Sequence, residues 1–276
     1  MSLLELARAA FLRACELDVA VRKPGNVSRV SPGHGMQARH FLDAAQAAVA
    51  PLLAPGARVG ARIEGAVAAS WAAAGCNTNL GIVLLCAPLA AAFERGGPLG
   101  TALQAVLAEL DVEDARAAFR AIVQARPGGL GRAGEADVHD EPTISLREAM
   151  ALAADRDSIA RQYAEGFHEV LQASQDLGFA LSGEAESGLR DAAVQHVYLG
   201  YLARWPDSHI VRKHGAALAQ IVMSAAQQWQ ARERPGEDPA FAAWDESLKQ
   251  QGLNPGTSAD LTVASLFAAG LRLAVA

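Results

Sequence analysis

The chain has 276 residues, 51% of them hydrophobic and 20% charged, so it can bury a large core and does not belong to the disordered class. Its formal net charge of -6 disfavours nucleic acid as a partner, because nucleic-acid-binding proteins normally carry a basic stripe. The three cysteines form no Cys-x-x-Cys pair, and we see neither a secretory start nor an apolar run long enough to span a membrane, so we expect a cytoplasmic protein.

Apolar residues recur at helical spacing along most of the chain, and no segment alternates as a strand would. Lys23-Pro24-Gly25 ends the first predicted helix, Pro55-Gly56 ends the second, and the third carries Glu64 beside its apolar stripe. The fold class that follows is all-α, with residues 1–276 in a single globular domain of about ten helices. The segments with helical periodicity are 3–22, 36–53, 59–71, 80–94, 99–110, 112–125, 145–153, 156–177, 185–203, 209–231, 238–251 and 258–274.

Two of the segments have an unusual composition. The predicted helix 80–94 is apolar on all sides, which is typical of a helix buried in a core. Segment 126–143 begins with Arg126-Pro127-Gly128-Gly129 and carries several acidic residues without helical periodicity. A loop of that length inside a compact domain is usually functional or mobile, so we single it out.

Three polar turns, 23–27, 75–81 and 254–260, carry more Asn, Gly and Lys than a turn between helices needs. In the last of them Pro and Gly break one helix, Thr257 and Ser258 can cap the next, and Asp260 falls in its first turn. The free N–H groups at a helix start suit an anion such as a phosphate. Any one of these turns taken alone is best read as an ordinary cap, but together they predict a polar pocket where helix ends converge.

Segment 155–163 places Asp155 and Asp157 two residues apart near a predicted helix start. In a regular helix these side chains point away from each other, so one can cap the helix while the other faces a ligand. Two interpretations stay open at this point: a metal-binding role, or Asp155 as the cap with Asp157 paired to Arg161 four residues later.

Segment 207–215 opens with Asp207 and Ser208, both good helix caps. His209, Arg212 and Lys213 then share one helix face, and three cationic or cationisable groups on a face suit a polyphosphate. A solvated basic surface is the alternative interpretation.

Five polar motifs, in order along residues 23–261, resemble those of the triphosphoribosyl-dephospho-CoA synthase family. One such motif is a weak signal, whereas five in the family's order are a strong one. The motifs are Lys23-Pro24-Gly25-Asn26-Val27, Asn77-Thr78-Asn79-Leu80-Gly81, Asp155-Arg156-Asp157-Ser158-Ile159-Ala160, Asp207-Ser208-His209-Ile210-Val211-Arg212-Lys213-His214-Gly215 and Leu253-Asn254-Pro255-Gly256-Thr257-Ser258-Ala259-Asp260-Leu261.

The resemblance implies an all-helical, ATP-dependent (tri)phosphoribosyl transferase. The 2′-hydroxyl of 3′-dephospho-CoA displaces adenine from C1 of the ATP ribose, with Mg²⁺ accompanying the ATP. The product is the precursor of the prosthetic group of citrate or malonate lyase-type acyl carriers. Such a reaction builds positive charge on the ribose, which carboxylates stabilise, and it needs a base for the hydroxyl and a proton for adenine.

The residues of this chain that the resemblance and the chemistry assign to the site fall into three groups. Glu64 is expected to be the base, with Asp157 and Asp260 as the other catalytic residues. Asp155, Asp157 and Asp260 are the expected Mg²⁺ ligands. The expected ATP-binding residues are Lys23, Asn26, Arg29, Asn77, Asn79, Arg212, Lys213, His214, Asn254 and Ser258.

The chain departs from the family's best-known members at two motifs. Asn26 and Ser28 stand where their first motif resembles Lys-Pro-Gly-Leu-Val-Asp-Arg, and Asn79 and Leu80 stand where their second resembles Asn-Thr-His-Lys-Gly. The acceptor is therefore open: a different acceptor, for example a one-carbon cofactor precursor, and a non-catalytic nucleotide-binding protein are the alternatives. The apolar segment 261–276 is expected to be either core or the face of a homo-oligomer.

Overall fold

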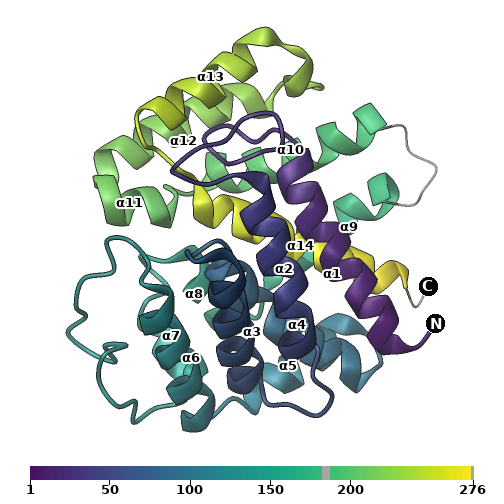
Figure 1. Ribbon diagram of the computed structural model, residues 1–276, viewed down its shortest axis with the longest axis vertical. Coiled ribbons are helices and arrows are strands. Elements are labelled where there is room, and N and C mark those ends of the chain that lie inside the picture. The colour runs from purple at the N-terminus through teal and green to yellow at the C-terminus, as the bar shows by residue number, and fades with distance from the viewer. Residues whose placement is uncertain (182–186, 275–276) are drawn as a thin grey trace.

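The computed structural model describes residues 1–181 and 187–274, and within these ranges the elements of regular secondary structure are all helices, with no strand. The expected all-α class is therefore confirmed, and Figure 1 shows the helices gathered into one globular body. The helices are α1 (Leu3–Ala20), α2 (Ala38–Leu52), α3 (Val59–Ala74), α4 (Leu80–Arg95), α5 (Leu99–Ala108), α6 (Val112–Ala125), α7 (Leu146–Ala151), α8 (Ser158–Ala164), α9 (His168–Leu181), α10 (Ser187–Arg204), α11 (Ser208–His214), α12 (Ala216–Gln230), the 3-10 turn η1 (Pro235–Glu237), α13 (Pro239–Gln250) and α14 (Gly256–Leu273).

Two of the twelve predicted segments are each divided in two, so the described residues form fourteen α-helices where about ten were expected. Segment 156–177 becomes α8 and α9, because Gly166 and Phe167 adopt positive φ angles of 70° and 61°. Segment 209–231 becomes α11 and α12, with Gly215 between them at a φ of 88°. Glycine accepts this left-handed backbone without the steric cost that other residues meet, so the breaks fall at these points.

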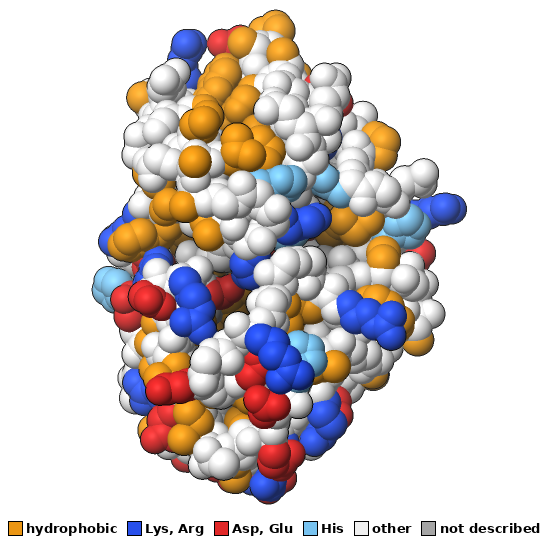
Figure 2. All heavy atoms as spheres, turned by 90° about the vertical axis from the view of Figure 1, so that its left-hand side faces the viewer, with side chains coloured by type: hydrophobic (Ala, Val, Ile, Leu, Met, Phe, Trp, Pro, Cys, Tyr) orange, Lys and Arg blue, Asp and Glu red, His pale blue; other side chains and the backbone are white. Residues whose placement is uncertain are grey.

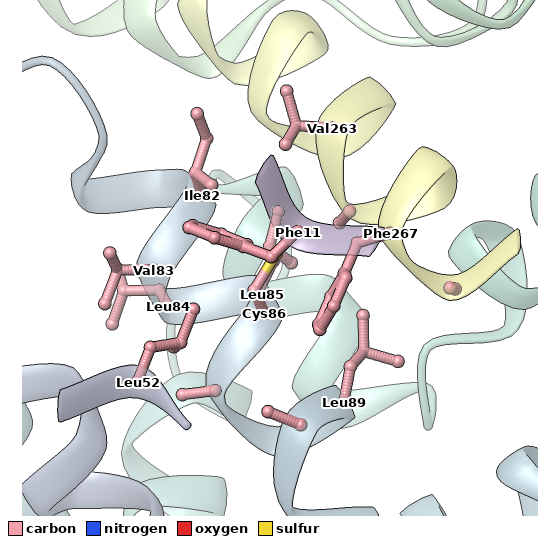
Figure 3. Close-up of a cluster of buried hydrophobic side chains, with 14 of the residues drawn as sticks. Phe11, Leu52, Ile82, Val83, Leu84, Leu85, Cys86, Leu89, Val263 and Phe267 are labelled. Carbon is pink, nitrogen blue, oxygen red and sulfur yellow. The ribbon is translucent and has the colours of Figure 1, made fainter. Parts of the chain in front are cut away.

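The core is built around α4, in which almost every residue is buried. Figure 3 shows α4 side chains packed against α1, α2 and α14, with Phe11 and Phe267 meeting edge to face at 5.7 Å between ring centroids. Burial of each large apolar side chain contributes about 1.5–3 kcal/mol, so the apolar composition of segment 80–94 explains its central position. Most of α14 is also buried. Of the two alternatives for segment 261–276, core or the face of a homo-oligomer, the described part of the segment is therefore core.

A second, smaller cluster of buried side chains joins α10, α11, α12, α13 and the start of α14. Trp229, Phe241 and Trp244 pack together within it. In Figure 1, α11, α12 and α13 lie above the larger core, and α14 passes between the two groups. The first turn of α14 therefore lies where the two clusters meet.

Of the described helices, none is by itself long and apolar enough to cross a membrane. The pair α4 and α5 satisfies the same length and composition test only when taken together, and it is bent by 113° at the break.

Candidate active site

A cavity of about 580 Å³ lies where the first turns of α4, α8, α11 and α14 converge. Residues of all five sequence motifs line it, from Asn26 in the first motif to Asp260 in the last. The loop 126–143 forms one further wall. Figure 2 shows the face of the molecule on this side, which is hollowed near its middle, with Lys and Arg side chains along the upper edge of the hollow.

Hydrogen bonds between helix caps hold three of these helix starts together. Asp207 caps α11 through the N–H groups of His209 and Ile210, at 3.0 and 3.2 Å, and accepts two more bonds from the backbone and hydroxyl of Ser258, both at 2.8 Å. Ser158 N–H at the start of α8 donates to Ser208 Oγ at 3.0 Å. The third, fourth and fifth motifs are therefore bound to one another by these hydrogen bonds.

Asp157 is the cap of α8, and its two oxygens have different partners. Oδ1 accepts from Ile159 and Ala160 N–H at 2.9 and 3.1 Å, while Oδ2 accepts from Arg212 Nη1 at 2.7 Å. The alternative that paired Asp157 with Arg161 is wrong: the guanidinium of Arg161 lies over the Trp205 ring instead, 4.1 Å from its centroid. Asp157 thus orients Arg212, and both residues line the cavity.

Asp260 lines the cavity from the first turn of α14 and lies against Gly81 in the first turn of α4. A Cβ added at Gly81 would lie 2.0 Å from Asp260 Oδ2, so the carboxyl occupies the space that the absent side chain leaves. The carboxyl is reachable from the cavity yet surrounded by protein, and this burial, reinforced by the negative charges of Asp18 and Asp207, raises the pKa of Asp260 well above its usual value. A carboxyl of this kind holds a proton that it can deliver.

The first and last motifs meet through a pair of amides. Asn26 Nδ2 donates to Asn254 Oδ1 at 3.1 Å, and both residues line the cavity. Gly25 packs so closely on the turn before α14 that a Cβ there would lie 2.7 Å from Pro255 Cδ. Its φ of 79° is one that other residues rarely adopt, so Gly25 is required for this contact.

Unsatisfied polar atoms gather at the cavity. Among the described residues, six buried side-chain nitrogen or oxygen atoms have no hydrogen-bond partner. Four of them belong to cavity-lining residues: Asn26, Thr78 and Arg212, together with Asp18, whose Oδ1 is nevertheless ion-paired with Lys23. Native proteins rarely leave buried polar atoms unpaired, so this concentration is typical of a site that binds a polar ligand.

Lys23 does not reach the cavity, contrary to the expectation that it binds phosphate. Its side chain is fully buried, its Nζ lies 2.9 Å from Asp18 Oδ1, and it also donates to the carbonyl of Asp18. Asp18, on α1, lines the cavity and was not singled out from the sequence. The available signal was its position four residues after Ala14 on the apolar stripe of a predicted helix, where an acidic residue is unusual.

His209 lines the cavity from α11 and packs against Gly256 at the start of α14. Burial, together with the positive charges of Arg212 and Lys213, lowers the pKa of His209 to about 4. The ring is therefore neutral at pH 7, and it offers a hydrogen bond rather than a charge to a ligand.

The loop 126–143 closes over α11 through its glycines. Gly129 has a φ of 75°, and a Cβ there would lie 2.5 Å from the Arg212 carbonyl oxygen, while the stem of Lys213 lies against Gly128. Asp137 organises the middle of the loop by accepting from the N–H groups of Ala133 and His139 and from the His139 ring. These bonds lower the pKa of Asp137 to about 2. The loop is thus a docked wall of the cavity.

Three predicted site residues lie away from the cavity and are corrected. Glu64 does not line it, because its carboxylate is held on the surface of α3 by Arg120 at 2.6 Å, which also lowers the pKa of Glu64 and makes it a weaker base. Arg29 is exposed and pairs with Glu16. The Asp155 side chain is 84% exposed beside Arg156.

Four others support the walls without lining the cavity. Asn79 donates to Ser70 Oγ at 2.9 Å, and His214 bonds the Gly252 carbonyl at 3.1 Å. Ser258 is bound to Asp207, and the stem of Lys213 packs on the loop 126–143. Of the fourteen positions expected at the site, the cavity brings together six, which are Asn26, Asn77, Asp157, Arg212, Asn254 and Asp260.

The expected Mg²⁺ ligands do not assemble. Asp155 points to solvent, and the oxygens of Asp157 are taken by helix N–H groups and Arg212, which leaves only Asp260 of the three. In the part of the chain that the structure describes, no group of three or more His, Cys, Asp or Glu side chains is placed to hold a metal ion. The residues present therefore do not fit a metal centre built by the protein alone.

The chain belongs to a known family of transferases that use ATP: a family model described as ATP:dephospho-CoA triphosphoribosyl transferase matches residues 4–275. The chain is also similar to a crystal structure from Archaeoglobus fulgidus that carries a provisional assignment as a triphosphoribosyl-dephospho-CoA synthase. That match has a TM-score of 0.65 and 26% identity, and it covers 83% of this chain and 97% of the other. No curated protein sequence matches the chain significantly.

Proposed function

We propose that this chain transfers the 5-triphosphoribosyl group of ATP to the 2′-hydroxyl of 3′-dephospho-CoA and releases adenine. One observation carries the proposal: residues of all five family motifs, which are spread over most of the sequence, line a single cavity. We further propose a cytoplasmic enzyme, since ATP is available there.

The polar part of the cavity suits the triphosphate and the ribose. Arg212 is held in place by Asp157 and presents a fixed cation, and the N–H groups at the starts of α4 and α14 add partial positive charge. Asn77 and Asn254 offer both donors and acceptors to sugar hydroxyls. Mg²⁺ enters, in this proposal, with the phosphates of ATP rather than as a resident ion of the protein.

We assign to Asp260 the role of helping adenine to leave. The acceptor oxygen forms a bond to C1 of the ribose as the bond from C1 to the adenine nitrogen breaks, and the electron pair of that bond goes to adenine. Asp260, with its raised pKa, donates the proton that adenine needs. The anion that remains lies near the positive charge developing on the ribose and stabilises it.

An apolar part of the same cavity suits a flat base. Leu84, Phe119, Ile122, Val138 and Met150 line it, from α4, α6, the loop 126–143 and α7. Ligand pockets commonly combine such apolar walls with a few polar groups that fix orientation. We assign this part to an adenine ring.

A different acceptor is the second candidate, and one observation favours it. Leu80 lines the cavity at the motif position where the best-known members of the family resemble Lys. An apolar side chain in place of a cation removes a contact to an anionic acceptor, and an acceptor with less phosphate would tolerate that loss.

The test is adenine release by the purified chain from ATP and Mg²⁺, with and without 3′-dephospho-CoA, followed by chromatography. Release that depends on dephospho-CoA supports the proposal. An Asp260→Asn variant should release adenine about 10²–10⁴-fold more slowly while still binding ATP. Release only with another hydroxylated acceptor would favour the second candidate, and ATP binding with no release under any condition would indicate a binding protein without turnover.

A further inference from the structure

The proposed reaction needs a base for the acceptor hydroxyl, and Glu64 does not line the cavity. Asp18 does line it, from the last turns of α1, although the residue is only 3% exposed. Among the other aspartate carboxyl groups that line the cavity, Asp157 caps α8 and binds Arg212, Asp137 accepts hydrogen bonds within the loop 126–143, and Asp260 is the proposed acid, so Asp18 is the aspartate left for the base.

The two oxygens of Asp18 differ in their surroundings. Oδ1 is buried and lies 2.9 Å from Lys23 Nζ. Oδ2 accepts no hydrogen bond from any residue that the structure describes and is not among the fully buried unpaired atoms, so it is the oxygen that a ligand in the cavity can reach. A carboxylate held on one side and open on the other is suited to accept a proton from a bound hydroxyl.

Lys23 fixes Asp18 from outside the cavity. Its ammonium also donates to the backbone carbonyl of Asp18, so the two residues form a closed unit at the junction of α1 and the first motif. The Lys23 side chain is fully buried and does not line the cavity. Its charge therefore reaches the reaction through Asp18 alone.

We infer that Asp18 is a catalytic residue, the base that takes the proton of the acceptor hydroxyl, and that Lys23 is a positioning residue that acts through Asp18. The inference rests on the proposed transfer. As the acceptor oxygen bonds to the ribose carbon, its proton passes to Asp18 Oδ2, and Asp260 gives its own proton to the departing adenine. Asp18 therefore gains one proton and Asp260 loses one in each transfer. The two carboxyl groups are close enough for the negative charge of Asp18 to raise the pKa of Asp260.

The experiment compares Asp18→Asn, Lys23→Met and the double variant for kcat and KM of adenine release and for ATP binding by calorimetry. We expect Asp18→Asn to lower kcat about 10²–10⁴-fold with little change in ATP affinity. Lys23→Met should lower kcat as well, and the double variant should be no slower than Asp18→Asn, because residues that act through one another are not additive.

The matched control is Arg62→Met, which removes a buried cation that pairs with Glu94 away from the cavity. It should lower thermal stability and leave kcat of the folded fraction unchanged. If Asp18→Asn fails to fold because Lys23 is left unpaired, the double variant, which removes both charges, is compared with Lys23→Met and should be slower.

Three outcomes have distinct meanings. Full kcat in Asp18→Asn, or in the double variant, overturns the inference while the proposed function stands. If the fold-losses in kcat of Lys23→Met and Asp18→Asn multiply in the double variant, the two residues act independently, and the positioning role of Lys23 is overturned. Failure of the unmodified chain to release adenine with any acceptor overturns the proposed function itself.

Discussion

Replacing Gly81 with Ala tests whether the carboxyl of Asp260 acts from the position that the structure gives it. The new Cβ would lie 2.0 Å from Asp260 Oδ2, 2.5 Å from its Cγ and 2.8 Å from Ile159 Cδ1. Real Cβ atoms essentially never approach another heavy atom within 3.0 Å, so the carboxyl must retreat by about 1 Å. A displacement of that size at a reacting group costs about 10²-fold in rate.

The effect on stability should be much smaller than the effect on rate. Overpacking costs about 1–3 kcal/mol, and Ala in a helix returns about 1 kcal/mol relative to Gly, so the free energy of unfolding should fall by about 0–2 kcal/mol. The assay is kcat of adenine release beside a thermal melt. Its matched control is Gly100→Ala, at the equivalent second position of α5, where the nearest atom to a new Cβ is Leu171 Cδ1 at 3.6 Å.

Gly100→Ala should keep its kcat and be as stable as the unmodified chain or slightly more so. The reasoning is refuted if Gly81→Ala retains the kcat of the unmodified chain while its melt shows a normal fold. In that case the carboxyl of Asp260 either is not in contact with Gly81 or does not act in the reaction.

Three further predictions concern Asp260 and the loop 126–143. Because the pKa of Asp260 is raised in the folded chain, the carboxyl costs stability that builds up as the pH rises from its unfolded pKa of about 4 to its folded pKa, and this cost is absent well below pH 4. Asp260→Asn should therefore melt higher than the unmodified chain at pH 8, and the difference should vanish near pH 3, whereas an equal difference at both pH values would contradict the burial argument. Gly129→Ala, which combines a φ of 75° with a contact of 2.5 Å, should undock the loop from α11 and raise KM for ATP several-fold, about 1 kcal/mol or more. Gly188→Ala in α10, which has no neighbour within 4 Å and does not line the cavity, should not. Asp137→Asn should make a protease cleave the loop faster at pH 7. In the unmodified chain the loop should loosen only as the pH falls from about 4 through about 2, because a lowered carboxyl pKa stabilises the ordered loop at pH values above the unfolded pKa. Equal cleavage rates for the variant and the unmodified chain would show that Asp137 does not order the loop.

The sequence by itself determined the helices and the identity of the polar motifs. Helical periodicity and strong local breakers are short-range properties, so segments such as 80–94 and the ends at Pro24-Gly25 and Pro55-Gly56 were predicted correctly. The composition of 80–94 also predicted its burial, because an apolar surface on all sides of a helix has no favourable exposed position.

Only the tertiary structure decided which polar side chains face the cavity. The first motif taken alone predicted that Lys23 binds phosphate. In the structure, Lys23 is buried against the carboxylate of Asp18, which is close to it in sequence, and Asp18 lines the cavity instead. Glu64 lies on a well-predicted helix, but its partner Arg120 comes from another helix more than fifty residues away. Periodicity gives the face of a helix on which a residue lies and says nothing of what packs against that face, so pairings over such separations are fixed by the packing of helices around α4 and α14.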